Sequence, residues 1–186
     1  MTGLRRAFVA VVPPAPVLDA LEPLVADLAA HAPQIRWLPR PQWHLTLQFL
    51  GAVDDAAALR EAVAAASAGH AAFDAQLAGG GAFPSVRRGA VLWVGVERND
   101  ALVRLAAAVQ DAMQPLGHRP DDRPFHPHLT LARAPRPRAL AELVETIGTG
   151  PVGPAWTVTD VAVVESDTRP TGAVHTVRDR LPLQGA

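Results

Sequence analysis

The chain has 186 residues, a formal net charge of −1 and a composition that is 49% hydrophobic, 19% charged and 5% aromatic, which is typical of a globular protein and excludes a disordered or collagen-like one. All 17 basic residues are arginine, and cysteine and tyrosine are also absent. These absences exclude Schiff-base and lysyl-nucleotidyl chemistry, thiol nucleophiles, disulfides and thiolate metal sites. The near-neutral net charge argues against a broad electrostatic footprint for duplex nucleic acid, although a small anionic ligand is compatible with it.

In the first half of the chain, the run Arg6 to Val12 is typical of a short buried strand. Apolar residues spaced by three and four then predict a helix over 17–28, which Pro23 is expected to kink or delay. The further elements expected in this half are a strand over 43–50, an alanine-rich helix over 54–67 and strands over 73–77 and 90–97, the last two separated by a glycine triplet at 79–81 that we interpret as a flexible loop or bulge.

The second half repeats this rhythm. It predicts a helix over 100–116, a proline-containing loop over 117–127, a strand over 128–134, a helix over 138–147 and closing strands over 156–165 and 173–181. The elements do not alternate strictly as in a parallel doubly wound sheet, so an α+β fold with largely antiparallel sheets is expected. The apolar run after Arg5-Arg6 is too short for an export signal, and no stretch approaches the ~18 apolar residues of a membrane span, so we expect a cytoplasmic protein.

One tetrapeptide occurs twice, as His44-Leu45-Thr46-Leu47 and as His128-Leu129-Thr130-Leu131. With this composition, a second copy by chance has odds of about one in two hundred, so the repeat is informative. Each copy lies in an expected strand, where the histidine and the threonine share one face and the two leucines share the other. The leucines are therefore expected in a core, and a pseudo-twofold relation between the halves would direct both imidazoles and both hydroxyls into one cleft.

Two imidazoles and two hydroxyls in one cleft suit phosphoryl chemistry without a metal or a cofactor. A neutral imidazole takes a proton from water, a protonated one donates to the departing ribose oxygen, and hydroxyls donate to phosphate oxygens. A single His-x-Thr is most often an ordinary strand segment, but two identical copies favour the catalytic interpretation. A zinc site that uses His44, His126 and His128 lacks a supporting ligand motif, and a serine hydrolase lacks its nucleophile elbow.

These motifs resemble those of the two-histidine (2H) phosphoesterases, and among them the bacterial and archaeal RNA 2′,3′-cyclic phosphodiesterases, also called 2′-5′ RNA ligases. Arg6 to Ala10 is similar to the opening strand of the family, Trp43 to Gly51 to its first motif and Phe125 to Arg133 to its second. The resemblance extends over nearly the whole chain. It implies one bilobal domain over residues 1–186, whose two interleaved lobes each supply one His-x-Thr-x motif to a central cleft between mostly antiparallel sheets and flanking helices.

The resemblance also implies roles for these residues. His44 corresponds to the proton donor and His128 to the proton acceptor, while Thr46 and Thr130 contact the phosphate. The implied activity is the opening of a terminal 2′,3′-cyclic phosphate on RNA or a nucleotide to give a 2′-phosphomonoester, and its reversal would join RNA ends through a 2′-5′ bond. Any such ligation would draw its energy from the strained cyclic phosphate, because a chain without lysine forms no lysyl-nucleotidyl intermediate.

Four further residues are candidates for substrate binding. Arg133 matches an arginine just beyond the second motif of the family, but strict alternation places it on the face opposite the second histidine unless the strand bulges near Ala132. Phe49 and Phe125 are candidates for stacking on a nucleobase, although aromatics in or beside strands more often belong to a core. His175 stands where the family commonly has tyrosine, and we interpret it as an ordinary strand residue rather than as a replacement for that aromatic ring.

Two alternatives remain open at this stage. One is a 2H enzyme that acts on another phosphate, such as a cyclic phosphate of ADP-ribose or a 2′-5′ oligonucleotide. The other is a non-catalytic module that binds RNA ends in the same cleft. In each case we expect a monomer that requires no membrane.

Overall fold

The computed structural model describes residues 3–97, 100–120, 122–169 and 172–186. Within them the strands are β1 Leu4–Val11, β2 Arg36–Trp37, β3 Leu45–Val53, β4 Phe73–Phe83, β5 Gly89–Glu97, β6 His128–Arg138, β7 Trp156–Val158, β8 Asp160–Arg169 and β9 Gly172–Pro182. The helices are α1 Ala15–His31, α2 Ala56–Ala68, α3 Asp100–Met113 and α4 Ala141–Ile147. The expected α+β class is confirmed.

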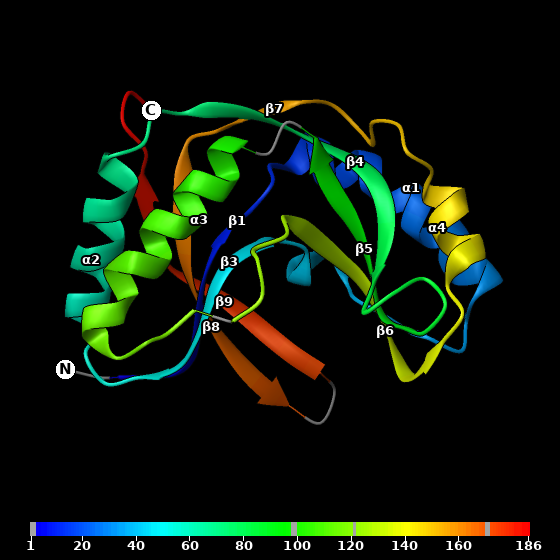
Figure 1. Cartoon of the computed structure of the whole chain (residues 1–186), viewed down its shortest axis with the longest axis horizontal. Coiled ribbons are helices and arrows are strands. Elements are labelled where there is room, and N and C mark those ends of the chain that lie inside the picture. Colours follow the sequence, from blue (N-terminus) through cyan, green and yellow to red (C-terminus); the bar gives the residue numbers. More distant parts are fainter. Residues whose placement is uncertain (1–2, 98–99, 121, 170–171) are drawn as a thin grey trace.

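All of the strands join one curled sheet in the order β7-β4-β5-β6-β3-β1-β8-β9, with β2 paired to β6 (Figure 1). Every pairing between these strands is antiparallel. The β6–β3 junction divides the sheet into two halves of four strands each, and each half contributes one copy of the repeated tetrapeptide. Helices α2 and α3 pack together at one end of the molecule, and α1 and α4 at the other.

The helices form where the sequence provides helix starts and apolar stripes. Asp55 caps α2, because its carboxylate accepts hydrogen bonds from the backbone N–H groups of Ala57 and Ala58, both at 3.0 Å. Helix α1 begins earlier than its apolar spacing predicts, at Ala15, and continues through Pro23, whose side chain is exposed. The late start expected from this proline is therefore wrong.

The core lies between the helices and one face of the sheet. Leu45, Leu47, Leu129 and Leu131, the four leucines of the two tetrapeptides, are at most 2% exposed and belong to this core, as alternation predicts. A second, small cluster lies on the other face of β1 and β8 and includes Phe8. Strand β1 is therefore buried on both faces, and its second face is the one on which the repeated histidines lie.

Three expectations about the strands need correction. The glycine triplet does not end a strand, because β4 continues through it with a bulge between Ala78 and Gly80, where Gly79 has a positive φ of 73°. The closing strand expected over 156–165 is two strands, since β7 pairs with β4 whereas β8 pairs with β1. Strand β2 was not predicted, because two residues are too few to give a periodic signal. Among the described residues, no helix is both long and apolar enough to cross a bilayer.

Candidate active site

The two tetrapeptides meet at the junction between the two halves of the sheet. Leu45 of β3 and Leu129 of β6 are direct antiparallel partners. Both leucines are fully buried in the core, so the residues on either side of them point to the opposite face of the sheet. Antiparallel register then brings His44 next to Thr130 and Thr46 next to His128, with a pseudo-twofold axis at the leucine pair. One face of one sheet thus collects both imidazoles and both hydroxyls.

His44 is held by its neighbouring rings and by the backbone before it. Its imidazole stacks on Phe8 of β1 with ring centroids 4.5 Å apart and meets His175 of β9 edge-on at 5.2 Å. The ring also hydrogen-bonds to the backbone of Gln42, two residues earlier. These contacts fix the ring in the plane that Phe8 sets.

His128 is anchored in the same way on the other side of the axis. Its Nδ1 lies 2.7 Å from the carbonyl oxygen of His126, again two residues earlier. A carbonyl only accepts, so Nδ1 carries the hydrogen and Nε2 of the neutral ring keeps its lone pair. Phe83 and Trp93 surround the ring, with centroids at 4.9 and 6.1 Å.

Both histidines are neutral in the free protein at neutral pH. Burial lowers the pKa of His44 to about 3, and the neighbouring His175 adds to this shift. Burial also lowers the pKa of His128, and charge on His126 and Arg133 acts in the same direction. The charges of His44, His128 and Arg133 therefore interact, which places these groups around one site. An anion bound among them would reverse the shifts, because it favours imidazolium.

A bulge brings Arg133 to this face. Along β6, Trp93 of β5 is opposite Thr130 and Leu92 is opposite Ala132, so Leu131 is the extra residue. The extra residue reverses the alternation, and Arg133 lies on the side of Thr130 rather than across the sheet. The condition under which the sequence would allow Arg133 to reach the cleft is therefore met.

The two phenylalanines suggested for base stacking lie in different surroundings. Phe49 of β3 is 64% exposed, with its ring 5.9 Å from that of Phe8. Phe125 is partly buried and packs against the main core. The aromatic rings that do contact the repeated histidines are those of Phe8, Phe83 and Trp93. Sequence reasoning did not assign these three to the site, because strand pairing rather than sequence distance brings them there.

His175 is part of the site rather than an ordinary strand residue. Gln42 explains its position, because its buried side-chain amide donates to the carbonyl oxygen of Ala173 at 2.6 Å and fastens the start of β9 to the segment before His44. The Nδ1 atom of His175 is buried and finds no hydrogen-bond partner in the described residues. Burial also lowers the pKa of this ring.

The site offers no arrangement suited to a protein-bound metal. Among the described residues, no group of three or more histidine, aspartate and glutamate side chains is placed to hold an ion. The segments 28–53 and 123–141, which carry the two motifs, contain no carboxylate side chain. The three histidines of the zinc alternative are distributed over both sides of the pseudo-twofold axis, with His126 exposed.

Comparisons with known proteins agree with this geometry. A family model described as the 2′-5′ RNA ligase superfamily matches residues 13–170. This chain belongs to that superfamily. The resemblance to the 2H phosphoesterases is thereby confirmed, and the chain is an enzyme of this family.

Curated relatives in the superfamily carry the name RNA 2′,3′-cyclic phosphodiesterase. The protein of Methanothermobacter thermautotrophicus is 30% identical over 176 residues, which cover 92% of this chain and 95% of that one. The protein of Thermus thermophilus is 35% identical over 164 residues, 80% of this chain and 77% of that one. The protein of Geobacillus stearothermophilus is 37% identical over 144 residues, 73% of this chain, but the match spans only 46% of its length.

Solved structures show the same fold. The protein TT0787 of Thermus thermophilus superposes with a TM-score of 0.73 at 32% identity and covers 97% of this chain and 98% of its own. Escherichia coli LigT complexed with 3′-AMP gives the same TM-score at 24% identity, with 97% and 98% covered. The latter match supports the fold alone.

Proposed function

We propose that this superfamily member is an RNA 2′,3′-cyclic phosphodiesterase that hydrolyses a terminal cyclic phosphate to a 2′-phosphomonoester by acid–base catalysis without a metal. The observation that carries the proposal is the Leu45–Leu129 pairing, because it places both His-x-Thr pairs on one face of the sheet across a pseudo-twofold axis. The names of the curated relatives support the choice of substrate.

In this mechanism His128 is the base. Its Nδ1 hydrogen is committed to the carbonyl of His126, so the free Nε2 lone pair accepts a proton from the attacking water. The lowered pKa of His128 keeps this lone pair available at neutral pH. As the water oxygen bonds to phosphorus, the bond from phosphorus to the 3′ oxygen breaks.

His44 is the acid that protonates the departing 3′ oxygen. In the free enzyme burial keeps this ring neutral, so a bound cyclic phosphate anion must supply the negative charge that protonates it. The hydroxyls of Thr46 and Thr130 and the guanidinium of Arg133 are donors for the non-bridging oxygens, on which negative charge develops. After one turnover His128 holds the proton and His44 has lost one, and exchange with solvent restores both.

The same groups run the reaction backwards by microscopic reversibility. A 2′,3′-cyclic phosphate attacked by a 5′-hydroxyl in place of water would give a 2′-5′ bond, with His128 again removing the proton from the nucleophile. The strained cyclic phosphate supplies the energy of this ligation. Incubation of two RNA fragments without ATP, followed by digestion that distinguishes 2′-5′ from 3′-5′ bonds, tests this extension.

The proposal is tested by hydrolysis of a 2′,3′-cyclic nucleotide and of an RNA oligonucleotide with a cyclic end. His44→Ala and His128→Ala should each lower the rate by roughly 10²–10⁴-fold. The double variant should lose little more, because the two histidines act in one proton-transfer sequence. Product analysis should give the 2′-phosphomonoester.

His31→Ala is the matched control, since this histidine is exposed at the end of α1. It should hydrolyse at the wild-type rate. A correctly folded His44→Ala or His128→Ala enzyme with near-wild-type activity contradicts the two-histidine mechanism. Binding of the cyclic end by the wild-type protein without turnover would instead identify a binding module.

A further inference from the structure

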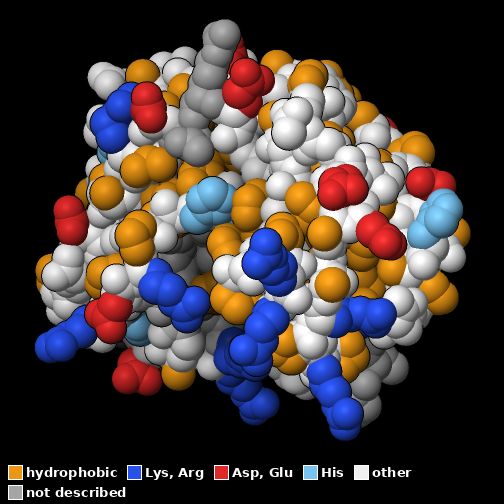
Figure 2. All heavy atoms as spheres, turned by 45° about the vertical axis from the view of Figure 1, so that its right-hand side comes forward, with side chains coloured by type: hydrophobic (Ala, Val, Ile, Leu, Met, Phe, Trp, Pro, Cys, Tyr) orange, Lys and Arg blue, Asp and Glu red, His pale blue; other side chains and the backbone are white. Residues whose placement is uncertain are grey.

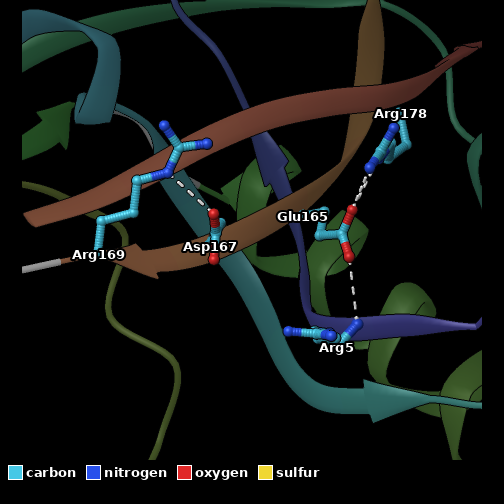
Figure 3. Close-up of polar contacts among 5 residues, drawn as sticks. All are labelled: Arg5, Glu165, Asp167, Arg169 and Arg178. Atoms are coloured by element: carbon cyan, nitrogen blue, oxygen red, sulfur yellow. Dashed lines mark hydrogen bonds and ion pairs between the residues drawn. The ribbon is translucent and has the colours of Figure 1, made fainter.

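The two sides of the cleft differ in how their arginines are compensated. On the side of the β8–β9 hairpin, arginines lie in ion pairs (Figure 3). Arg178 binds Glu165, whose other carboxylate oxygen accepts a hydrogen bond from the backbone N–H of Arg5 at 3.2 Å, and Arg169 Nε lies 2.9 Å from Asp167. Positive charge on this side is therefore largely neutralised.

The other side carries arginines without acids. No aspartate or glutamate occurs in residues 28–53, 75–96 or 123–141, the segments that form β2, most of β4, β5 and β6. We use the term arginine ridge for six exposed residues of these segments, namely Arg36, Arg87, Arg88, Arg133, Arg136 and Arg138. Within the described part of the chain, no carboxylate lies within ion-pair distance of any of them.

Strand pairing makes the ridge continuous. Arg36 of β2 is the direct partner of Arg133 of β6, and Gly89, which follows Arg88, is the partner of Arg138. The turn between β4 and β5 is also fastened to the end of β6, because the carbonyl of Val86 accepts a hydrogen bond from Leu140 N at 2.8 Å. The β4–β5 turn thus lies beside the end of β6, and the ridge runs from one to the other.

The ridge begins in the candidate active site. Arg133, its first member on β6, shares the face of Thr130 and interacts electrostatically with both repeated histidines. Figure 2 shows a histidine at the edge of a hollow, with arginine side chains gathered around and below the hollow on this face. From Arg133 to Arg138 the strand covers about 16 Å.

Uncompensated like charges on neighbouring strands destabilise a fold, so a binding partner of opposite charge is the physical reason to keep them together. Guanidinium groups suit phosphate in particular, through bidentate hydrogen bonds. We infer that the arginine ridge binds the phosphate backbone of an RNA chain, so that the nucleotides 5′ to the cyclic end leave the cleft over β6 and the β4–β5 turn and not over the β8–β9 hairpin. This inference rests on the proposed function.

The inference specifies the class of substrate. A cyclic mononucleotide or an ADP-ribose cyclic phosphate engages the histidines and Arg133 but is too short to follow the ridge to Arg138. An oligonucleotide reaches the whole ridge. The net charge of −1 conceals this feature, because the compensating acids lie in other segments of the chain.

The experiment compares two substrates and two triple variants. The ridge variant is Arg87→Gln/Arg136→Gln/Arg138→Gln, which leaves Arg133 in place. The control variant is Arg169→Gln/Arg178→Gln/Arg180→Gln, which removes the same charge from the hairpin side, where each arginine is ion-paired. The substrates are a 2′,3′-cyclic mononucleotide and a single-stranded RNA of about ten nucleotides with the same cyclic end.

For the oligonucleotide, the ridge variant should lower kcat/KM by roughly 10–100-fold, and the dependence of log kcat/KM on log salt concentration should become shallower by about 2, close to 0.7 for each lost phosphate contact on a single strand. Its kcat/KM for the mononucleotide should stay at the wild-type value. The control variant should match wild type on both substrates.

The possible failures are distinguishable. A wild-type enzyme that hydrolyses the mononucleotide but gains nothing from the longer RNA overturns the ridge and leaves the proposed function standing. An equal loss in both triple variants shows a general charge effect and also overturns the ridge. A folded wild-type enzyme that hydrolyses neither substrate overturns the proposed function itself.

Discussion

At the scale of single residues, the site depends on two rings that are held by the same device. Each repeated histidine hydrogen-bonds to the backbone of the residue two positions before it, His44 to Gln42 and His128 to His126. Each ring also contacts a phenylalanine of a neighbouring strand, Phe8 or Phe83. Backbone anchoring fixes ring orientation without a carboxylate, and the rings can therefore remain neutral until substrate arrives.

The lowered pKa values predict a difference between two pH profiles. The profile of kcat/KM reports groups in the free enzyme and that of kcat reports them in the complex. Because the pKa of His44 is about 3 and that of His128 is also lowered, the kcat/KM bell should be centred below the ~6.5 of an ordinary imidazole. Bound phosphate raises both values, so the kcat bell should lie at higher pH.

The same shift can be measured without turnover. If substrate raises the pKa of His44 through neutrality, binding of inorganic phosphate near pH 7 should take up protons. Calorimetry in buffers with different ionisation enthalpies measures this uptake, and His44→Gln should reduce it. Coincident kcat and kcat/KM profiles, or binding with no proton uptake, would contradict the pKa assignment.

A further consequence at this scale is independence from metals. The charge developing in the reaction is met by imidazolium, hydroxyl and guanidinium groups, and the segments that carry the motifs contribute no carboxylate. Hydrolysis should therefore persist after exhaustive treatment with EDTA and dialysis into metal-free buffer. Loss of activity on chelation and its recovery with zinc or manganese would support a metal mechanism instead.

At the scale of elements, the bulge at Leu131 shows where sequence prediction reaches its limit. Alternation correctly placed the leucines of both tetrapeptides in the core and the histidines opposite them. The same rule would place Arg133 on the wrong face, because nothing in the sequence marks Leu131 as the extra residue. One inserted residue changes the face of every side chain beyond it, so long strands are predictable only up to their first bulge.

Neighbours supplied by other strands were also outside the reach of sequence. Phe8, Trp93 and His175 contact the repeated histidines because β1, β5 and β9 are placed next to them by strand order. Strand order in an antiparallel sheet is set by long-range packing, not by local pattern. The motif residues could be identified because they repeat, whereas these neighbours carry no repeat or motif of their own.

Strand β4 provides a test of how such a neighbour supports the site. A Cβ atom on Gly81 would lie 2.1 Å from the ring of Trp93, which itself packs against His126 with ring centroids 4.8 Å apart. Gly81→Ala should therefore displace this ring, destabilise the fold by about 1–3 kcal/mol and lower hydrolysis. Thermal unfolding monitored by circular dichroism and a rate assay would measure both effects.

Gly150→Ala is the control for this substitution, because a Cβ atom there meets nothing within 4 Å. It should leave the unfolding temperature and the rate close to the wild-type values. A Gly81→Ala enzyme with unchanged stability and unchanged rate would show that the Trp93 ring yields freely and does not support His128.

At the scale of the whole molecule, the junction between the two halves of the sheet organises both the site and the charge. The single pairing of Leu45 with Leu129 brings one motif from each half together, so neither half contains a complete site. The same junction separates an ion-paired wall, built from β8 and β9, from a wall rich in uncompensated arginine, built from β2, β5 and β6. A chain with almost no net charge thus presents two electrostatically different walls.

The buried histidines should also make stability depend on pH. An imidazole with a lowered pKa in the folded state binds its proton less well there than in the unfolded chain, where it titrates near ~6.5. Between about pH 5 and 7 the unfolded state therefore binds more protons, and the free energy of unfolding should fall as pH falls, by up to about 1.4 kcal/mol per pH unit for each such histidine. His44, His128 and His175 act with the same sign. Urea unfolding at half-unit steps over this window, above the range in which ordinary carboxylates titrate, should show a positive slope with pH in the wild type. His44→Gln should reduce the slope by about one proton, whereas His31→Ala, which removes an exposed histidine, should leave it unchanged. A flat profile in the wild type, or an unaltered slope in His44→Gln, would show that the site does not hold its imidazoles neutral.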